Sequence, residues 1–166
     1  RAHRQPGSAF KPFVYATAFK KGYTPETVVF DLKTQFSTLC DSKGVPFSGA
    51  KKEDCYTPGN YDNVFRGPVS LRDALAQSMN IPAIKTLYLA GLQDSLRTAK
   101  DMGIRSLTNI NTYGLTLVLG GGEVSLLDIT SAYSVFANEG VRNPQTAILE
   151  VRDSEGESEG REKAGV

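Results

Sequence analysis

The stretch Arg4-Gln5-Pro6-Gly7-Ser8-Ala9-Phe10-Lys11-Pro12-Phe13 decides the fold, because it sets Ser8 three residues before Lys11, directly after a proline-glycine turn. If a helix begins here, residues i and i+3 share a face, with Cβ atoms about 5–6 Å apart. A serine hydroxyl is a weak nucleophile until a base removes its proton, and a nearby lysine can do this without a histidine. The turn predicts that Ser8 caps the helix N-terminus, and Pro12 is tolerated only near a helix start.

The same spacing has a plain structural interpretation. Serine and lysine are common, so a separation of three arises by chance in many chains. An N-cap serine followed by a solvated lysine accounts for it equally well. Taken alone, the spacing favours this structural interpretation over a catalytic one.

Composition limits the class of protein. The chain has 166 residues, of which 40% are hydrophobic and 22% charged, as expected for one soluble globular domain. The net charge of +1 implies no nucleic-acid partner. No apolar run approaches the roughly 20 residues of a membrane helix, and no signal peptide opens the chain. Because the first residue is arginine, we expect a segment of something longer.

Cysteine and histidine are scarce. Cys40 and Cys55 are not in a Cys-x-x-Cys pair, and His3 is the one histidine, so we predict no metal site and no cofactor. A disulfide between the two cysteines, or two free thiols, remain equal alternatives. Gly120-Gly121-Gly122 predicts a flexible loop, and it lacks the following lysine and serine or threonine of a phosphate-binding loop.

The pattern of apolar residues, caps and turns predicts an α+β fold that is mostly helical. We expect a partial domain over residues 1–152, and a turn and frayed tail over residues 153–166. Expected helices cover residues 9–21, 70–80, 82–90, 93–102 and 125–137, with strands over 27–30 and 146–152 and a long irregular segment over 23–69.

A second pair, Ser78-x-Asn80, lies at a predicted helix end just before Pro82. A helix that stops here can leave both side chains pointing into a groove. The alternative is a C-terminal region where asparagine simply tolerates left-handed geometry. Serine acyltransferases that handle β-lactams use Ser-x-x-Lys, then Ser-x-Asn, then Lys-Thr/Ser-Gly, which favours a functional pair.

Residues 4–13 resemble the nucleophile segment of class A penicillin-binding proteins, which are bifunctional peptidoglycan synthases. The resemblance runs from about Arg4 to Arg152. Its further blocks are Tyr56-Thr57-Pro58-Gly59-Asn60-Tyr61-Asp62, Phe65, Gly67-Pro68-Val69, Leu71-Arg72, Ala74-Leu75, Ser78, Asn80, Pro82-Ala83, Leu119-Gly120, Glu123-Val124, Ala132-Tyr133 and Phe136-Ala137-Asn138.

The resemblance implies a peptidoglycan D,D-transpeptidase domain with the helical part of the penicillin-binding and β-lactamase-like fold. Ser8 then matches the nucleophile and Lys11 its base. Ser78 matches the residue that relays a proton to the leaving group, and Asn80 the residue that binds the substrate amide. Backbone N–H groups, one of them from Ser8, would hold the oxyanion. The implied partners are stem peptides ending in D-Ala-D-Ala, and β-lactam antibiotics as covalent inhibitors.

The implied location is the extracytoplasmic face of a bacterial cell membrane, with an anchor and a glycosyltransferase domain outside this chain. The third motif is missing, because Lys33-Thr34 is followed by glutamine and Lys85-Thr86 by leucine. We therefore expect an internal fragment with a half-site, most of the central antiparallel sheet missing, and weak or no activity alone. Two rivals remain: a serine enzyme that hydrolyses β-lactams, and a non-catalytic binding or scaffolding module of the same fold.

Two geometric expectations follow. The Ser8 hydroxyl and the Lys11 amine should lie within hydrogen-bond reach, with Ser78 close to both. The segment from Asp31 to Val69 should wrap over the helices, with Tyr56, Tyr61 and Phe65 packed as anchors.

Overall fold

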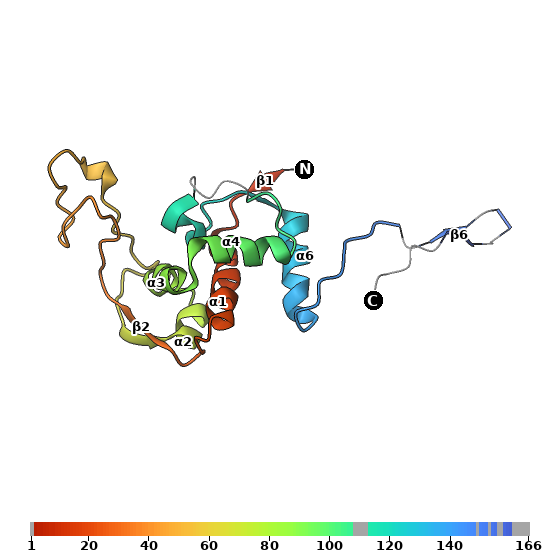
Figure 1. Ribbon diagram of the computed structural model, residues 1–166, viewed down its shortest axis with the longest axis horizontal. Coiled ribbons are helices and arrows are strands. Elements are labelled where there is room, and N and C mark those ends of the chain that lie inside the picture. The colour runs from red at the N-terminus through yellow and green to blue at the C-terminus, as the bar shows by residue number, and fades with distance from the viewer. Residues whose placement is uncertain (1, 108–112, 149, 153, 156–157, 161–166) are drawn as a thin grey trace.

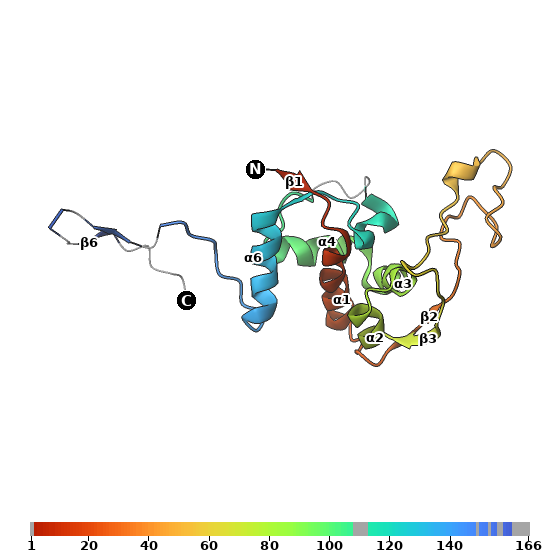
Figure 2. The ribbon, with the colours of Figure 1, turned by 180° about the vertical axis from the view of Figure 1, so that it is seen from behind.

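The computed structural model describes residues 2–107, 113–148, 150–152, 154–155 and 158–160. A helical body is built around α1 (Lys11–Lys20), which contacts both α3 (Asn80–Ala90) and α4 (Leu92–Asp101) (Figures 1 and 2). Most of α1 is buried, with Phe13, Val14 and Tyr15 fully inside. The hydrophobic effect therefore fixes the helix that carries the first motif.

The start and end of α1 follow from local chemistry. A 3-10 turn, η1 (Gly7–Phe10), leads into the helix, and Pro12 occupies its second position, where a missing N–H costs nothing. The chain leaves the helix at Gly22, whose φ of 96° suits glycine. The predicted helix over residues 9–21 is confirmed within two residues at its start.

Two predicted serine caps are also confirmed. Ser70 accepts a hydrogen bond from the Asp73 N–H at 3.1 Å and begins α2 (Leu71–Ala76). Ser125 accepts one from the Asp128 N–H at 3.0 Å and begins α6 (Leu126–Ala137). Each oxygen satisfies an amide that would otherwise lack a partner. The next helix after α2 begins at Asn80, earlier than the Pro82 start that the sequence indicated.

The strands are short and pair antiparallel. β1 (His3–Arg4) pairs with β4 (Val124–Ser125), β2 (Val28–Asp31) with β3 (Gly67–Ser70), and β5 (Val151–Arg152) with β6 (Ser158–Gly160). Two further 3-10 turns are η2 (Lys52–Asp54) and η3 (Gly114–Leu119). In the described part of the chain, helices therefore predominate over strands, which form only three small antiparallel pairs, and this confirms the predicted α+β fold class.

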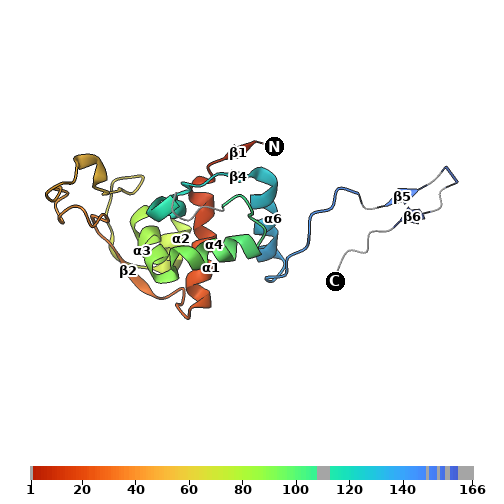
Figure 3. The same ribbon diagram turned by 45° about the horizontal axis from the view of Figure 1, so that its top comes forward.

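A projecting arm, residues 32–58, corrects the prediction that this segment wraps over the helices (Figures 1 and 3). At its base, Phe36 packs between Tyr56, at 6.3 Å between ring centroids, and Tyr88, at 6.1 Å. Just beyond it, Tyr61 is fully exposed and Phe65 is 39% exposed. Tyr56 therefore anchors the segment as expected, and the other two rings do not.

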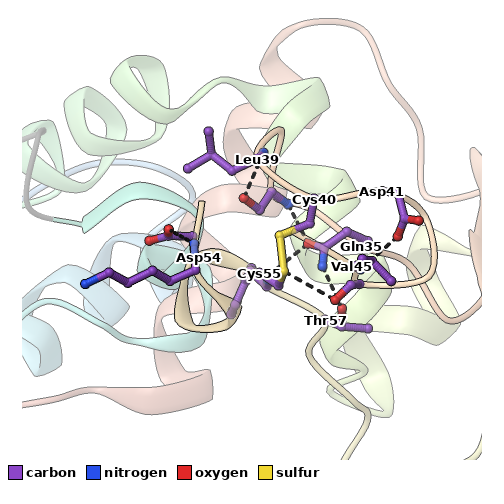
Figure 4. The surroundings of a disulfide bond; sticks show 12 residues. Gln35, Leu39, Cys40, Asp41, Val45, Asp54, Cys55 and Thr57 are labelled. Atoms are coloured by element: carbon purple, nitrogen blue, oxygen red, sulfur yellow. Dashed lines mark hydrogen bonds between the residues drawn. A yellow bond between two sulfur atoms is a disulfide. The ribbon is translucent and has the colours of Figure 1, made fainter. Parts of the chain in front are cut away.

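The arm departs from the helices because it satisfies its own polar groups. Cys40 and Cys55 form a disulfide, with Cα atoms 5.6 Å apart, which decides between the two alternatives left by the sequence (Figure 4). Beside it, the Gln35 side chain accepts from the Ser37 and Tyr56 amides and donates to the Thr57 hydroxyl. In a chain-entropy account, closing a loop of about 15 residues stabilises by about 3 kcal/mol.

The C-terminal segment leaves the helical body on the side opposite the arm (Figures 1 and 2). The strand expected over residues 146–152 is reduced to Val151–Arg152, and Ile148 and Val151 are exposed. Among the described residues, no strand of the helical body pairs with this segment, and its one partner is β6. The predicted turn and tail over 153–166 lie largely outside the described residues. Within the described ranges, every helix is too short or too polar to cross a lipid bilayer.

Candidate active site

Ser8 lies on η1 at the surface of the helical body. The cap position of η1 falls to Pro6, which has no side chain able to accept a bond, so the prediction that Ser8 caps a helix is wrong. The Ser8 hydroxyl makes no hydrogen bond with any described residue. The first amide bonded within η1 belongs to Ala9, which donates to Pro6 at 3.2 Å. The Ser8 N–H precedes it and has no partner inside this turn.

Lys11 is almost completely buried, at 1% exposure, which excludes the solvated lysine of the structural interpretation. Its amine donates to the Ser78 carbonyl at 2.6 Å, to the Ser78 hydroxyl at 3.1 Å and to the Asn80 side-chain oxygen at 2.9 Å. These partners lie 67 and 69 residues further along the chain. The structure thus brings together three of the four residues that the two motifs predicted.

The expected hydrogen bond between Ser8 and Lys11 is not formed. An ammonium group has three protons, and the three acceptors from Ser78 and Asn80 occupy them all. The Ser8 hydroxyl would be a fourth partner. A neutral amine has two protons and a lone pair, so deprotonation frees one direction for the serine.

Burial lowers the pKa of Lys11 from 10.5 to about 8. Hydrogen bonds to the charged form oppose this change, and the loss of water outweighs them. Lys11 forms no ion pair with a carboxylate of any described residue. With a pKa near 8, about one amine in ten is neutral at pH 7, compared with fewer than one in a thousand for a free lysine.

Ser78 occupies the turn between α2 and α3 in a left-handed conformation, with φ of 53°. The alternative interpretation of the sequence had assigned left-handed geometry to Asn80 instead. For a residue other than glycine it costs of the order of 1–3 kcal/mol and persists only when its surroundings impose it. Here the Ser78 and Met79 amides donate back to Leu75 and Ala74 at the end of α2. The turn directs both oxygens of Ser78 at Lys11.

Asn80 begins α3, and its amide has a fixed orientation. The Asn80 side-chain nitrogen donates to the Gly59 carbonyl at 3.0 Å, so its oxygen faces Lys11. The next residue, Asn60, is buried and accepts from the backbone amides of Asn80 at 2.9 Å and Ile81 at 3.3 Å. Gly59 and Asn60 belong to the block of residues 56–62 that resembles the family, and no role was predicted for either. The block itself was the available signal.

The three glycines at 120–122 lie in a loop, as predicted, and this loop packs closely against other segments. A Cβ on Gly120, whose φ is 84°, would lie 2.1 Å from the Gly7 backbone nitrogen. A Cβ on Gly122 would lie 2.4 Å from the Leu107 side chain. Gly120 is needed because the backbone at the end of η3 packs directly on the turn that precedes Ser8, and Gly122 because it packs on Leu107.

Helix α6 supports the same turn from another direction. The Tyr133 hydroxyl donates to the Ala9 carbonyl at 2.8 Å. The Tyr133 and Phe136 rings each lie 5.5 Å from the Phe13 ring, the first of them edge-on. Aromatic pairs at such distances add to the energy of burial. The segment around Ser8 is therefore braced by η3 and α6 as well as by α1.

A recess of about 120 Å³ adjoins Ser78. An ion pair between Asp62 and Arg66, at 2.5 Å, lies at this recess. The recess is lined by residues at the end of α2 and in the segment after Gly59, namely Asn60, Tyr61, Asp62, Arg66, Gln77, Ser78 and Met79. Elsewhere in the described ranges, no three His, Cys, Asp or Glu side chains gather closely enough to hold a metal ion.

A family model described as the penicillin binding protein transpeptidase domain matches residues 2–164. The chain belongs to this family. It is 38% identical over 157 residues to penicillin-binding protein 1A of Aquifex aeolicus, a match that covers 95% of this chain and 20% of the relative. Penicillin-binding protein 2D of Bacillus subtilis is 34% identical, over 94% of this chain and 21% of the relative.

Among solved structures, penicillin-binding protein 1A from Haemophilus influenzae is similar to this chain with a TM-score of 0.80 and 28% identity. The match covers 97% of this chain and 22% of that one. These findings confirm the resemblance to class A penicillin-binding proteins and the prediction that the chain has part of their transpeptidase fold. The chain spans about a fifth of the length of the curated relatives it matches.

Proposed function

We propose that this chain carries the serine half of a peptidoglycan D,D-transpeptidase site, with Ser8 as nucleophile, Lys11 as general base, Ser78 as proton relay and Asn80 as the residue that orients the others and the substrate amide. One observation carries the proposal. A buried lysine amine is held by Ser78 and Asn80, on the same segment as a surface serine hydroxyl that has no described partner. Burial lowers the pKa of this lysine to about 8, and titratable groups with perturbed pKa values concentrate at functional sites.

The first half-reaction moves one proton and exchanges one bond. Neutral Lys11 takes the proton of the Ser8 hydroxyl while the Ser8 oxygen bonds to the carbonyl carbon of the D-Ala-D-Ala peptide bond. The Ser8 N–H, free within its turn, is placed to stabilise the oxyanion. The carbon–nitrogen bond then breaks, and the proton passes from Lys11 through the Ser78 hydroxyl to the departing D-Ala amine. The 3.1 Å contact from Lys11 to Ser78 is the first link of that path.

The second half-reaction reverses this proton path. The amine of an acceptor stem peptide attacks the acyl-enzyme ester and gives up a proton, which returns to the Ser8 oxygen as the ester bond breaks. Water in place of that amine would give hydrolysis. Since the same groups serve both directions, Lys11 must be able to hold and release a proton near neutral pH, which a pKa of about 8 permits.

The proposal extends to partners and location. β-Lactams, whose strained amide imitates the D-Ala-D-Ala bond, should acylate Ser8. The reaction belongs on the extracytoplasmic face of a bacterial membrane, with membrane attachment through a part outside these 166 residues. The Cys40–Cys55 disulfide supports an oxidising location. We also propose that residues 1–152 form the partial transpeptidase domain and that residues 153–166 are a turn and tail that follow it.

A non-catalytic module is the second candidate, because the 166 residues contain neither Lys-Thr-Gly nor Lys-Ser-Gly. In the family that motif supplies a second cation and another oxyanion donor. Losing one such donor typically costs about 10²–10³ in rate. The isolated chain should therefore acylate slowly or not at all, and activity belongs to the complete protein that contains it.

Intact mass spectrometry after incubation with a labelled penicillin tests the proposal in the complete protein. We expect one adduct, lost in Ser8→Ala and retained in the matched control Ser48→Ala, an exposed serine of the arm. An adduct that persists in Ser8→Ala would contradict the assignment. Slow release of the adduct favours a transpeptidase, whereas fast catalytic turnover of the penicillin would favour the β-lactam hydrolase.

A further inference from the structure

Asn60 is 5% exposed, lies twenty residues before Asn80, and uses both ends of its amide. Its oxygen accepts from the first two backbone amides of α3, those of Asn80 and Ile81. Its nitrogen donates to the Asp31 carboxylate, at 2.8 and 2.9 Å, and to the Val64 carbonyl at 2.8 Å. Asn60 therefore caps α3 from a distant loop, a position that helices normally fill with a local residue.

Asp31 fixes which way the Asn60 amide faces. This carboxylate on β2 is completely buried, and it also accepts from the Arg66 amide at 3.0 Å. A carboxylate can only accept, so the Asn60 nitrogen must face Asp31 and the Asn60 oxygen must face α3. The reverse orientation would set an oxygen against the carboxylate and an NH2 group against two helix amides.

The donor and acceptor order set by Asp31 continues along the hydrogen bonds to Lys11. Since Asn60 is held in place, the preceding Gly59 carbonyl is held in place and accepts from the Asn80 nitrogen. The Asn80 oxygen is then left to face the lysine amine at 2.9 Å. From Asp31 to Lys11, each donor finds an acceptor in only one orientation of each amide. Satisfied networks of this kind specify a single geometry, and a partly satisfied network is costly.

We propose that Asp31 and Asn60 are positioning residues of the acylation site: they set the amide of Asn80 so that its oxygen faces Lys11. The inference rests on the proposed function for its consequence. Neither residue touches the reacting atoms. A residue that only stabilises α3 would alter the melting temperature and leave the titration of Lys11 unchanged, so the two roles can be separated.

The experiment measures the rate of Ser8 acylation by a labelled penicillin from pH 6 to 10 in the complete protein. In Asn60→Ala we expect the maximal rate to fall about tenfold, equivalent to about 1.4 kcal/mol. The midpoint of the pH profile should move to lower pH, because the charged amine loses an acceptor. Asp31→Asn, which turns one oxygen into an NH2 group, should shift the midpoint the same way by less.

Ser125→Ala is the matched control, because it removes a buried oxygen that caps α6 and has no contact with Lys11. It should lower the melting temperature and leave the midpoint in place. If the midpoint of the pH profile is unchanged in both Asn60→Ala and Asp31→Asn, the positioning role is overturned. If neither variant folds, Asp31 and Asn60 have a structural role only, and the positioning role is overturned as well. If the unmodified protein is not acylated at Ser8, the proposed function itself fails, so the two failures are distinct.

Discussion

The helical body and the arm are stabilised in different ways. Around Lys11, the body joins residues 67 and 69 positions apart by buried hydrogen bonds. The arm is closed by neighbours in sequence, with a disulfide that spans 15 residues and polar contacts around Gln35 and Asp41. The difference teaches that the site depends on the tertiary packing of the body, whereas the arm is a local structure with its own support.

Of the substitutions considered, Gly120→Ala should destabilise the helical body most. The Gly120→Ala Cβ would lie 2.1 Å from the Gly7 nitrogen, and the added Cβ also strains a positive φ. We expect a loss of at least about 3 kcal/mol of unfolding free energy and no measurable acylation of Ser8. Thermal denaturation and labelled-penicillin binding measure both.

Gly49→Ala in the arm is the matched control. Gly49 has a similar φ of 90°, and nothing lies within 4 Å of a Cβ built there. That variant should cost about 1 kcal/mol and leave acylation intact. Equal effects of the two substitutions would show that the close contact between Gly120 and Gly7 has no special role.

Removing the lysine amine should come next in size. Lys11→Met keeps an unbranched apolar chain and removes the general base, which typically contributes 10²–10⁴ in rate. Lys33→Met, an exposed lysine in the arm, should leave the acylation rate unchanged. Stopped-flow acylation of folded variants, checked by circular dichroism, makes the comparison. A fall of less than tenfold in the acylation rate of Lys11→Met would contradict the role of Lys11 as general base.

Opening the arm should have the smallest effect on the site. A double Cys40→Ser, Cys55→Ser variant loses about 3 kcal/mol of local loop stabilisation, so the arm should be cut faster in limited proteolysis. Acylation should stay within about twofold, because no residue of the disulfide loop hydrogen-bonds to Lys11, Ser78 or Asn80. A tenfold fall in acylation would mean that the arm supports the site and would end the contrast between the two regions.

The sequence predicted the features that local residues decide, and it did not predict those that depend on contacts between distant segments. Helix ends were predictable where one residue decides them, as with the caps Ser70 and Ser125. The convergence of Lys11 with Ser78 and Asn80 was predictable from the two motifs and their resemblance to a known family. Local pattern could not indicate that Gly120 packs on Gly7 or that Asp31 orients Asn60. Both depend on contacts between segments far apart in the chain.

The arm shows the opposite limit. The aromatic residues of the arm and of the segment that follows it suggested packing on the helices, yet Tyr61, just beyond the arm, is exposed while its neighbour Asn60 is turned inward. Residues 60–63 form a turn, in which the Asn63 N–H donates to the Asn60 carbonyl at 3.1 Å, and the two adjacent side chains face different sides of it. Which of the two sides meets the core is decided by the buried Asp31, which lies 29 residues earlier.

The pH dependence of Ser8 acylation in the complete protein tests the central claim most directly. The reactive form has a neutral Lys11, so the rate should rise with pH through the lowered pKa of about 8 and level off above it. Between pH 7 and the plateau we expect about a tenfold gain, absent in Lys11→Met. A midpoint near 8 supports a buried lysine base held by Ser78 and Asn80. A rate independent of pH, or one that still rises through pH 10.5, would contradict it.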